Sequence, residues 1–197
     1  GLIHELGEWV LLEACRQIGA LHPERDFRVT INLSAKQFSR PGPLLDCVLQ
    51  ALRESGLMPS QLELEITESV LIDDRPEVGE FINQLDRIGV RLAIDDFGTG
   101  YSALNYLQRF PFDVLKIDRS LTSDIPDNGA NAASIRAMIA MAHALDLEVI
   151  AEGVENRSQA GFLLVHHCEL GQGFLYSKPV DVPTLREHLA LEPALTA

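Results

Sequence analysis

Two adjacent aspartates, Asp95 and Asp96, stand at the end of an apolar run in the stretch "LAIDDFGTGYSALNYL", residues 92–107. Two like charges side by side repel each other, and burial strengthens the repulsion. A metal ion, a nearby cation or full exposure to water could compensate for it. The alternative without a catalytic role is that Asp-Asp before Phe-Gly forms a turn or a helix N-cap.

Polar side chains also occur near the C-terminal ends of the other expected strands. They are Asn32 after "RVTI", Glu65 in "LELEIT", Lys116 after "DVL", Glu152 after "EVIA" and Gln172 after "HCELG". Apolar strands rarely contain carboxylates without partners, which favours a function for Glu65 and Glu152. For the others, a structural reading stays open: Lys116 could pair with Asp118, and Asn32 could cap a short helix.

The types of these side chains indicate the chemistry. Carboxylate and amide oxygens suit hard cations such as Mg²⁺ or Mn²⁺, and no cluster of thiols or histidines points to zinc. Two metal ions can stabilise the attacking and leaving oxygens of a phosphoryl displacement. In such a site Asp95 would bridge the ions and Asp96 would bind the second one. Lys116 could orient or stabilise hydroxide, and Glu152 could be a metal ligand or a general base.

The elements that must position these residues alternate between strand and helix. The sequence predicts strands at 28–34, 62–67, 90–95, 113–118, 147–153 and 167–173, and helices at 5–20, 43–54, 76–88, 102–109, 130–145, 157–165 and 183–190. This order predicts an α/β fold with a parallel sheet. An open doubly wound sheet and a TIM-like (β/α)₈ barrel both fit it. A barrel needs about 250 residues, so about six of its βα units would be visible here.

Composition limits the class of protein. With 197 residues, of which 46% are hydrophobic, we expect one domain over residues 1–197. The 29 acidic residues against 16 basic ones argue against DNA as a partner. Three scattered cysteines favour free thiols in a reducing cytoplasm. No run is long enough to span a membrane and no signal peptide is visible, so we expect no membrane contact by this segment, although its parent protein could be membrane-anchored.

Taken together, the motifs resemble the EAL domains of bacterial cyclic-di-GMP signalling. The resemblance runs from about residue 1 to 180 and rests on "INLSAKQF", "LELEITES", "IDDFGTGYSALNYLQRFPFDVLKID", "VIAEGVE" and "GQGFLYSKP". It implies a (β/α)₈ barrel that hydrolyses cyclic di-GMP to linear pGpG with Mg²⁺ or Mn²⁺, with two ions expected. It also implies regulatory or GGDEF-type domains in the parent protein, and a homodimer as a possible assembly.

The resemblance assigns a role to each matching residue. By this resemblance Asn32, Glu65, Asp95 and Asp96 are metal ligands, Lys116 contacts the hydrolytic water, and Glu152 and Gln172 belong to the catalytic centre. Glu68 resembles the residue that steadies the loop 97–102, which contains Phe97, Gly98, Thr99 and Gly100. Glu155 resembles a residue that supports the metal ligands without binding the metal itself.

The chain departs from the family pattern in one respect. The Glu-Ala-Leu motif that names the family lies upstream of Gly1, where this sequence begins. We therefore expect an N-terminally truncated domain that lacks one metal ligand and is a poor enzyme in isolation. A noncatalytic cyclic-di-GMP receptor is the first alternative, and an unrelated metal-dependent barrel enzyme, such as an enolase-like lyase, is the second.

Overall fold

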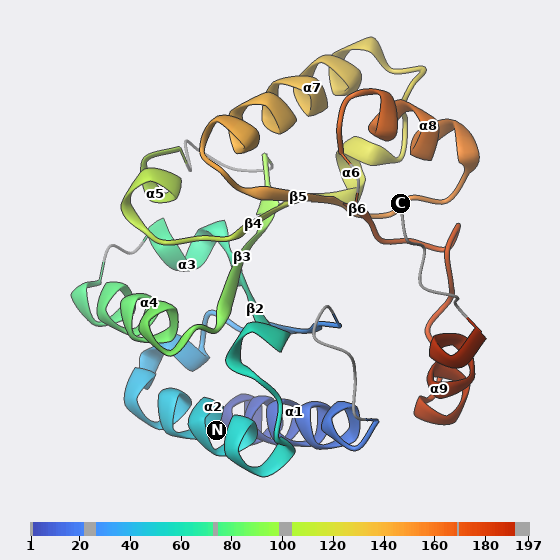
Figure 1. Cartoon of the computed structure of the whole chain (residues 1–197). Helices are drawn as coiled ribbons and strands as arrows, with labels where there is room; N and C mark the ends of the chain where they lie inside the picture. The colour runs from blue at the N-terminus through green and yellow to red at the C-terminus, as the bar shows by residue number, and fades with distance from the viewer. Residues whose placement is uncertain (1, 22–26, 73–74, 99–103, 169, 192–197) are drawn as a thin grey trace.

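The computed structural model describes residues 2–21, 27–72, 75–98, 104–168 and 170–191, and Figure 1 draws the remainder as a grey trace. The strands form one six-stranded sheet in the order β1-β2-β3-β4-β5-β6, and every neighbouring pair is parallel. The strands are β1 Val29–Leu33, β2 Leu62–Thr67, β3 Arg91–Phe97, β4 Val114–Ile117, β5 Glu148–Ala151 and β6 Leu170–Gly171. The sheet curls into half a barrel with helices around its outside, which confirms the predicted fold class (Figure 1).

The helices connect successive strands, as parallel pairing requires. They are α1 Leu2–Gly19, α2 Pro41–Ser55, α3 Glu68–Ile72, α4 Pro76–Ile88, α5 Leu104–Arg109, α6 Arg119–Thr122, α7 Gly129–Ala144, α8 Arg157–Val165 and α9 Val182–Leu191, with 3₁₀ turns η1 Gln37–Ser39 and η2 Pro59–Gln61. In the part of the chain that the structure describes, no helix has both the length and the apolar character needed to cross a membrane.

Proline and glycine set the ends of two helices. α2 begins at Pro41 and α4 at Pro76, where a proline needs no N–H partner. Gly56 and Gly89 follow these helices with φ angles of 71° and 90°, in the left-handed region that glycine tolerates best. Their N–H groups donate back to carbonyls of the last helical turn, which ends each helix as the sequence predicts.

The structure differs from the prediction in the length of one strand and in two additional short helices. β6 contains only Leu170 and Gly171 rather than residues 167–173, because the chain before it remains bound to α8: His167 has a φ of 65° and the Cys168 N–H donates to the Leu163 carbonyl. The short helices α3 and α6 are not predicted by the sequence. With five and four residues respectively, they are too short to show a helical period.

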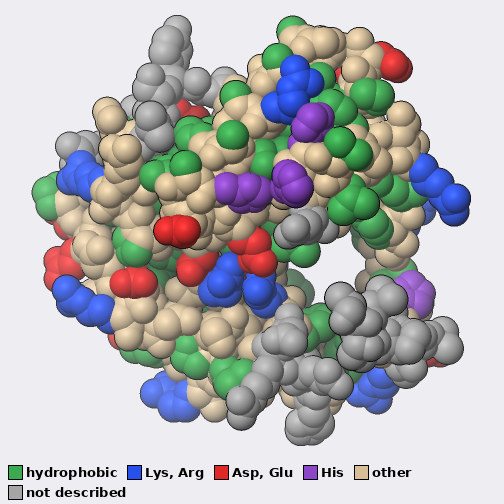
Figure 2. Space-filling model, turned by 45° about the horizontal axis from the view of Figure 1, so that its top comes forward, with side chains coloured by type: hydrophobic (Ala, Val, Ile, Leu, Met, Phe, Trp, Pro, Cys, Tyr) green, Lys and Arg blue, Asp and Glu red, His purple; other side chains and the backbone are tan. Residues whose placement is uncertain are grey.

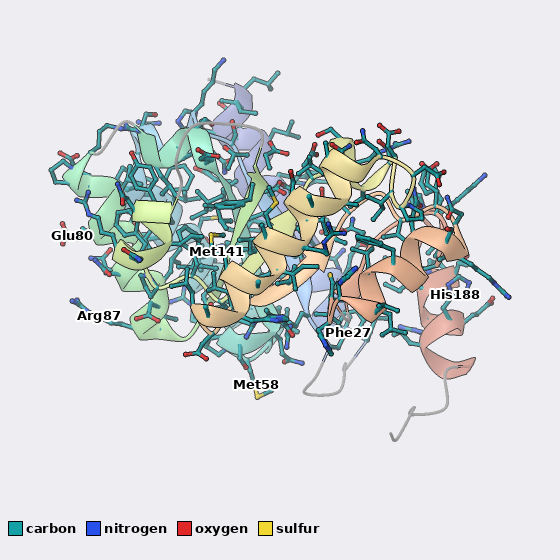
Figure 3. The ribbon with its side chains drawn as sticks, turned by 90° about the horizontal axis from the view of Figure 1, so that it is seen from above. Phe27, Met58, Glu80, Arg87, Met141 and His188 are labelled. Atoms are coloured by element: carbon teal, nitrogen blue, oxygen red, sulfur yellow. The ribbon has the colours of Figure 1, made fainter. Side chains whose placement is uncertain are left out.

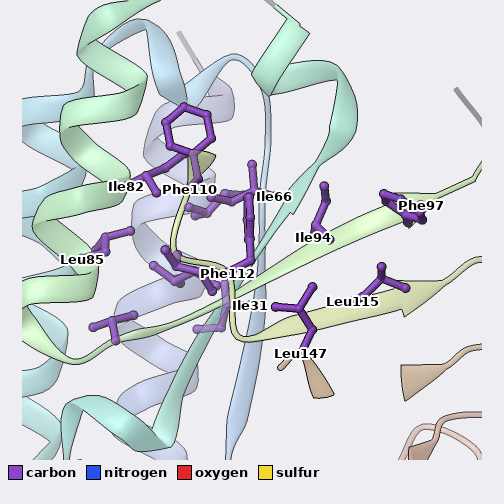
Figure 4. Packing of buried hydrophobic residues seen from close by; sticks show 14 of the residues in the cluster. Ile31, Ile66, Ile82, Leu85, Ile94, Phe97, Phe110, Phe112, Leu115 and Leu147 are labelled. Carbon is purple, nitrogen blue, oxygen red and sulfur yellow. The ribbon is translucent and has the colours of Figure 1, made fainter. Parts of the chain in front are cut away.

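Alternation along the strands gives the sheet an apolar outer face and a polar inner face. Figure 4 shows Ile66 of β2 on the side of the sheet that faces Ile82 and Leu85 of α4, and Leu115 of β4 close to Leu147. The buried hydrophobic side chains form one cluster that extends from α1 to the residues just before β6. Charged side chains of α4 such as Glu80 and Arg87 extend away from it (Figure 3). The inner face is therefore left for polar groups.

Candidate active site

The sheet register brings the predicted site residues onto the inner face. Asn32 is the register partner of Glu65 across β1 and β2, and Asp95 is the partner of Thr67 across β2 and β3. Lys116 lies between the outward-facing Leu115 and the next residue of β4, so its side chain also points inward. All of these residues are near the C-terminal ends of parallel strands, where barrel enzymes build their active sites.

Lys116 lies at the centre of this group. Its side chain is buried, with 3% exposed, and its Nζ is hydrogen-bonded to Glu65 Oε1. The same Nζ lies 2.5 Å from Glu152 Oε1 and 3.7 Å from Asp95 Oδ1. One ammonium therefore joins carboxylates from β2, β3 and the segment after β5. The predicted alternative, an ion pair with Asp118, is wrong: that carboxylate instead accepts from the Ser120 N–H and caps α6.

The contacts of Lys116 determine its charge. Burial alone would lower its pKa, but hydrogen bonds to Glu152 and Glu65 outweigh burial and raise the pKa. Burial raises the pKa of Glu65, and the hydrogen bond from Lys116 partly opposes that effect. Lys116 consequently stays protonated at neutral pH and acts as a hydrogen-bond donor rather than as a base.

The chain separates the two adjacent aspartates by a bulge. The register of β3 against β4 shifts between Ile94 and Phe97, and Asp96 has a φ of 57°. As a result Asp95 is buried near Lys116, whereas Asp96 is exposed. The repulsion between the two carboxylates is thus reduced by a cation on one side and by water on the other.

The residues after β5 and β6 border a cavity next to this group. The cavity measures about 190 Å³ and is lined by Arg119, Glu152, Gly153, Glu155, Gln172, Gly173 and Phe174. Gln172 is exposed, and its backbone N–H donates to Ala151. Glu155 pairs with Arg119 at 2.7 Å, an exposed ion pair at the rim of the cavity. The cavity opens beside Glu152 and has room for part of a small ligand.

Only some of the predicted loop residues belong to the described structure. Phe97 is buried at the end of β3, and Gly98 has a φ of 95°. Thr99 and Gly100 lie outside the described residues. Glu68, which resembles the residue that steadies this loop, is the first residue of α3 and directly follows β2. Its side chain is buried and its Oε1 has no hydrogen-bond partner among the described residues, and burial raises its pKa.

The resemblance found in the sequence implies divalent cations, and the chemistry of the inner face fits such an ion. The described residues contain no group of three or more His, Cys, Asp or Glu side chains arranged to hold a metal ion. Lys116 instead neutralises the carboxylates around it. However, Asp95 Oδ1 is buried and accepts no hydrogen bond in the described structure, because Lys116 Nζ lies 3.7 Å away. The predicted metal ligands beside it carry carboxylate or amide oxygens. A buried carboxylate oxygen that accepts no hydrogen bond, among other oxygen ligands, fits a divalent cation that prefers oxygen.

Sequence reasoning missed three residues around the segment that carries Glu152. Arg119 lines the cavity, while Thr122 and Gln159 are buried and hydrogen-bonded to the backbone around it. The pattern Asn-x-x-Gln at 156–159 resembles a helix-capping box and could have indicated the start of α8. It could not indicate the contacts with α6, which lie 36 and 37 residues away in the sequence.

Comparison with known proteins identifies the family. The sequence profile described as EAL domain matches residues 1–179, so the chain belongs to the EAL domain family. The cyclic di-GMP phosphodiesterase NbdA of Pseudomonas aeruginosa is 44% identical over 191 residues, which cover 96% of this chain and 24% of NbdA. The chain spans about a quarter of the length of the curated relatives it matches.

Solved structures show the same fold. A complex of the Pseudomonas aeruginosa phosphodiesterase MucR with cyclic di-GMP has a TM-score of 0.88 and 42% identity, covering 94% of this chain and 75% of that one. The Klebsiella pneumoniae protein BlrP1 in a complex with manganese and cyclic di-GMP has a TM-score of 0.82 and 31% identity, covering 89% and 45%. The curled parallel sheet is therefore that of EAL domains.

Proposed function

We propose that this chain is a phosphodiesterase domain that hydrolyses cyclic di-GMP to linear pGpG. The observation that supports this most directly is the buried ammonium of Lys116 among three carboxylates at the C-terminal edge of the sheet, in a chain of the EAL family. Relatives named as cyclic di-GMP phosphodiesterases, NbdA among them, support the choice of substrate.

The proposed reaction adds water across one phosphodiester. A water oxygen attacks phosphorus, the bond from phosphorus to the ribose oxygen breaks, and the departing oxygen takes up a proton. We assign Glu152 to accept the proton of the water, because its carboxylate is partly exposed at the cavity. The protonated Lys116 donates hydrogen bonds that orient the attacking oxygen.

The same proposal includes a divalent cation. Asn32, Glu65, Asp95 and Asp96 would hold Mg²⁺ or Mn²⁺, and we expect two ions. When bound, the cations stabilise negative charge on the phosphate and the leaving oxygen. The relative BlrP1 was solved with manganese, which supports this class of ion.

The proposal extends to the organisation of the whole protein. One continuous core supports a single domain over residues 1–197. MucR, 42% identical over 192 residues, is named as both a diguanylate cyclase and a cyclic di-GMP phosphodiesterase. We therefore propose GGDEF-type or regulatory domains as partners within the parent protein, with a homodimer as a possible assembly.

Asp95→Asn tests the proposed function in the full-length protein. The change removes a charge next to Lys116 and weakens the cation site, so we expect pGpG formation with Mn²⁺ to fall on the order of 10²-fold or more. Asp86→Asn, an identical change on the exposed face of α4, serves as the matched control and should leave turnover unchanged. Binding of cyclic di-GMP without any hydrolysis by the wild type would instead support a receptor.

A further inference from the structure

Gln159, the third residue of α8, is buried with 3% of its surface exposed, and its side-chain amide uses all of its hydrogen-bonding capacity. Its Oε1 accepts from the backbone N–H groups of Glu155 at 2.7 Å and Asn156 at 3.1 Å. Its Nε2 donates to the carbonyls of Thr122 at 3.1 Å and Ser123 at 3.0 Å. Two donors on one side and two acceptors on the other also fix which end of the amide is oxygen.

This amide joins the two segments that follow the Lys116 and Glu152 strands. α6 begins two residues after β4, which carries Lys116, and the segment 152–156 follows β5 and carries Glu152. The fully buried Thr122 reinforces the connection, because its hydroxyl donates to the carbonyl of Glu152 itself. The backbone of Glu152 is thus held from α6 while its carboxylate lies 2.5 Å from Lys116 Nζ.

We propose that Gln159 is a positioning residue that locks the segment 152–156 onto α6 and thereby keeps the Glu152 carboxylate against Lys116. The inference rests on the proposed phosphodiesterase function for its catalytic consequence. Gln159 itself is not among the residues that line the cavity. It acts through the backbone that carries Glu152.

Helix capping alone does not account for Gln159. The capping box of α8 needs only an acceptor at this position, together with the Asn156 side chain, which accepts from the Gln159 N–H at 3.0 Å. A glutamate would supply the same acceptor. The two N–H donors toward Thr122 and Ser123 are what only an amide provides here, and they point away from α8 and into α6.

The test compares Gln159→Met, Gln159→Glu and Asn156→Ala in the full-length protein. The methionine has nearly the same size and makes none of the hydrogen bonds, whereas the glutamate keeps the capping acceptor and loses the two donors. Asn156→Ala is the matched control, since it removes the helix cap and leaves the contacts with α6 in place. Three quantities are measured: hydrogen exchange of segments 119–123 and 152–156, the midpoint of thermal unfolding, and kcat with KM for cyclic di-GMP.

We expect both Gln159 variants to exchange faster in both segments and to lose kcat on the order of 10²-fold with little change in KM, because a displaced Glu152 affects the reaction more than binding. Asn156→Ala should lower the unfolding midpoint while kcat stays within about twofold of the wild type.

Unchanged hydrogen exchange in Gln159→Met would refute the proposal that Gln159 holds the segment 152–156 on α6. Recovery of kcat in Gln159→Glu, or an equal loss in Asn156→Ala, would reduce Gln159 to a capping residue. Absence of hydrolysis in the wild type would reject the proposed function. The exchange rates would still show whether Gln159 holds the segment 152–156 on α6.

Discussion

Glu68 is a carboxylate that the fold buries without giving one of its oxygens a hydrogen-bond partner among the described residues. Burial raises its pKa above the ordinary value of 4.5, so the folded state binds a proton more readily than the unfolded chain. The free energy of unfolding therefore decreases as the pH rises from about 4.5 through the folded-state pKa of Glu68. Above that pKa the full destabilisation by the charged carboxylate is present.

Glu68→Gln removes this cost. At pH 8 we expect the variant to be more stable than the wild type by about 1 kcal/mol, with the difference shrinking toward pH 4.5 as the wild-type carboxyl protonates. Urea unfolding at both pH values measures it. We also expect slower hydrolysis, because a charge kept at such a cost is typical of a functional position. Equal stability at both pH values would contradict the assignment of an unpaired, charged Glu68.

Single side chains were predictable where their type conflicts with their surroundings. Glu65, Asp95, Lys116 and Glu152 are polar groups next to apolar strands, and the structure brings all four together. Gln159 gives no such signal, because a glutamine in the first turn of a helix is ordinary. Its importance arises from backbone atoms of α6, and no local pattern encodes contacts at that separation.

The connection between β5 and α8 depends on a glycine. Gly153 has a φ of 67°, and a Cβ added to it would lie 2.3 Å from Arg119 Cγ on α6. Gly153→Ala therefore has both backbone strain and a clash, and we expect a loss of stability of more than about 1 kcal/mol. Gly161→Ala is the matched control: it lies inside α8 with nothing within 4 Å, and should stabilise by about 0.5–1 kcal/mol. Chemical unfolding compares the two, and a neutral Gly153→Ala would argue against close contact between this segment and α6.

Most helices and strands were predictable from their period or from the residues at their ends. α1, α2, α4, α7, α8 and α9 match predicted helices, because each has enough turns to show a period or clear end signals. α3, α6 and the short β6 depend on tertiary contacts, such as the hydrogen bond of the Cys168 N–H to α8. The bulge at Asp96 was likewise not predictable, although it separates the two aspartates that the sequence marks as a problem.

The parallel order of the strands followed from the alternation of strands and helices, but the ion pairs that connect their N-terminal ends did not. Arg91 of β3 lies 2.7 Å from Glu148 of β5 and 3.4 Å from the buried Glu63 of β2, and it approaches Asp113 at 3.8 Å. Arg28, just before β1, also pairs with Glu148 at 2.6 Å. Acidic and basic side chains lie side by side in the same way near the middle of the face in Figure 2. This cluster links five of the six strands, whereas each strand taken alone shows only a charge near its start.

Arg91→Met tests how much the curled sheet depends on this cluster. Burial already raises the pKa of Glu63, and Arg91 opposes that effect, so the variant leaves a carboxylate buried without its main partner. We expect a loss of about 3 kcal/mol at pH 8. Because the folded-state pKa of Glu63 is above its ordinary 4.5, the loss should shrink as the pH falls toward that value and the carboxyl becomes neutral. Urea unfolding at pH 8 and pH 5 provides the measurement.

Arg87→Met, on the exposed face of α4, is the control and should change stability by less than about 0.5 kcal/mol. Adding Glu63→Leu to Arg91→Met should recover most of the loss, because an apolar pair needs no counter-ion. A double variant no more stable than Arg91→Met would mean that Arg91 holds the strands through Glu148 and Asp113 rather than by neutralising Glu63.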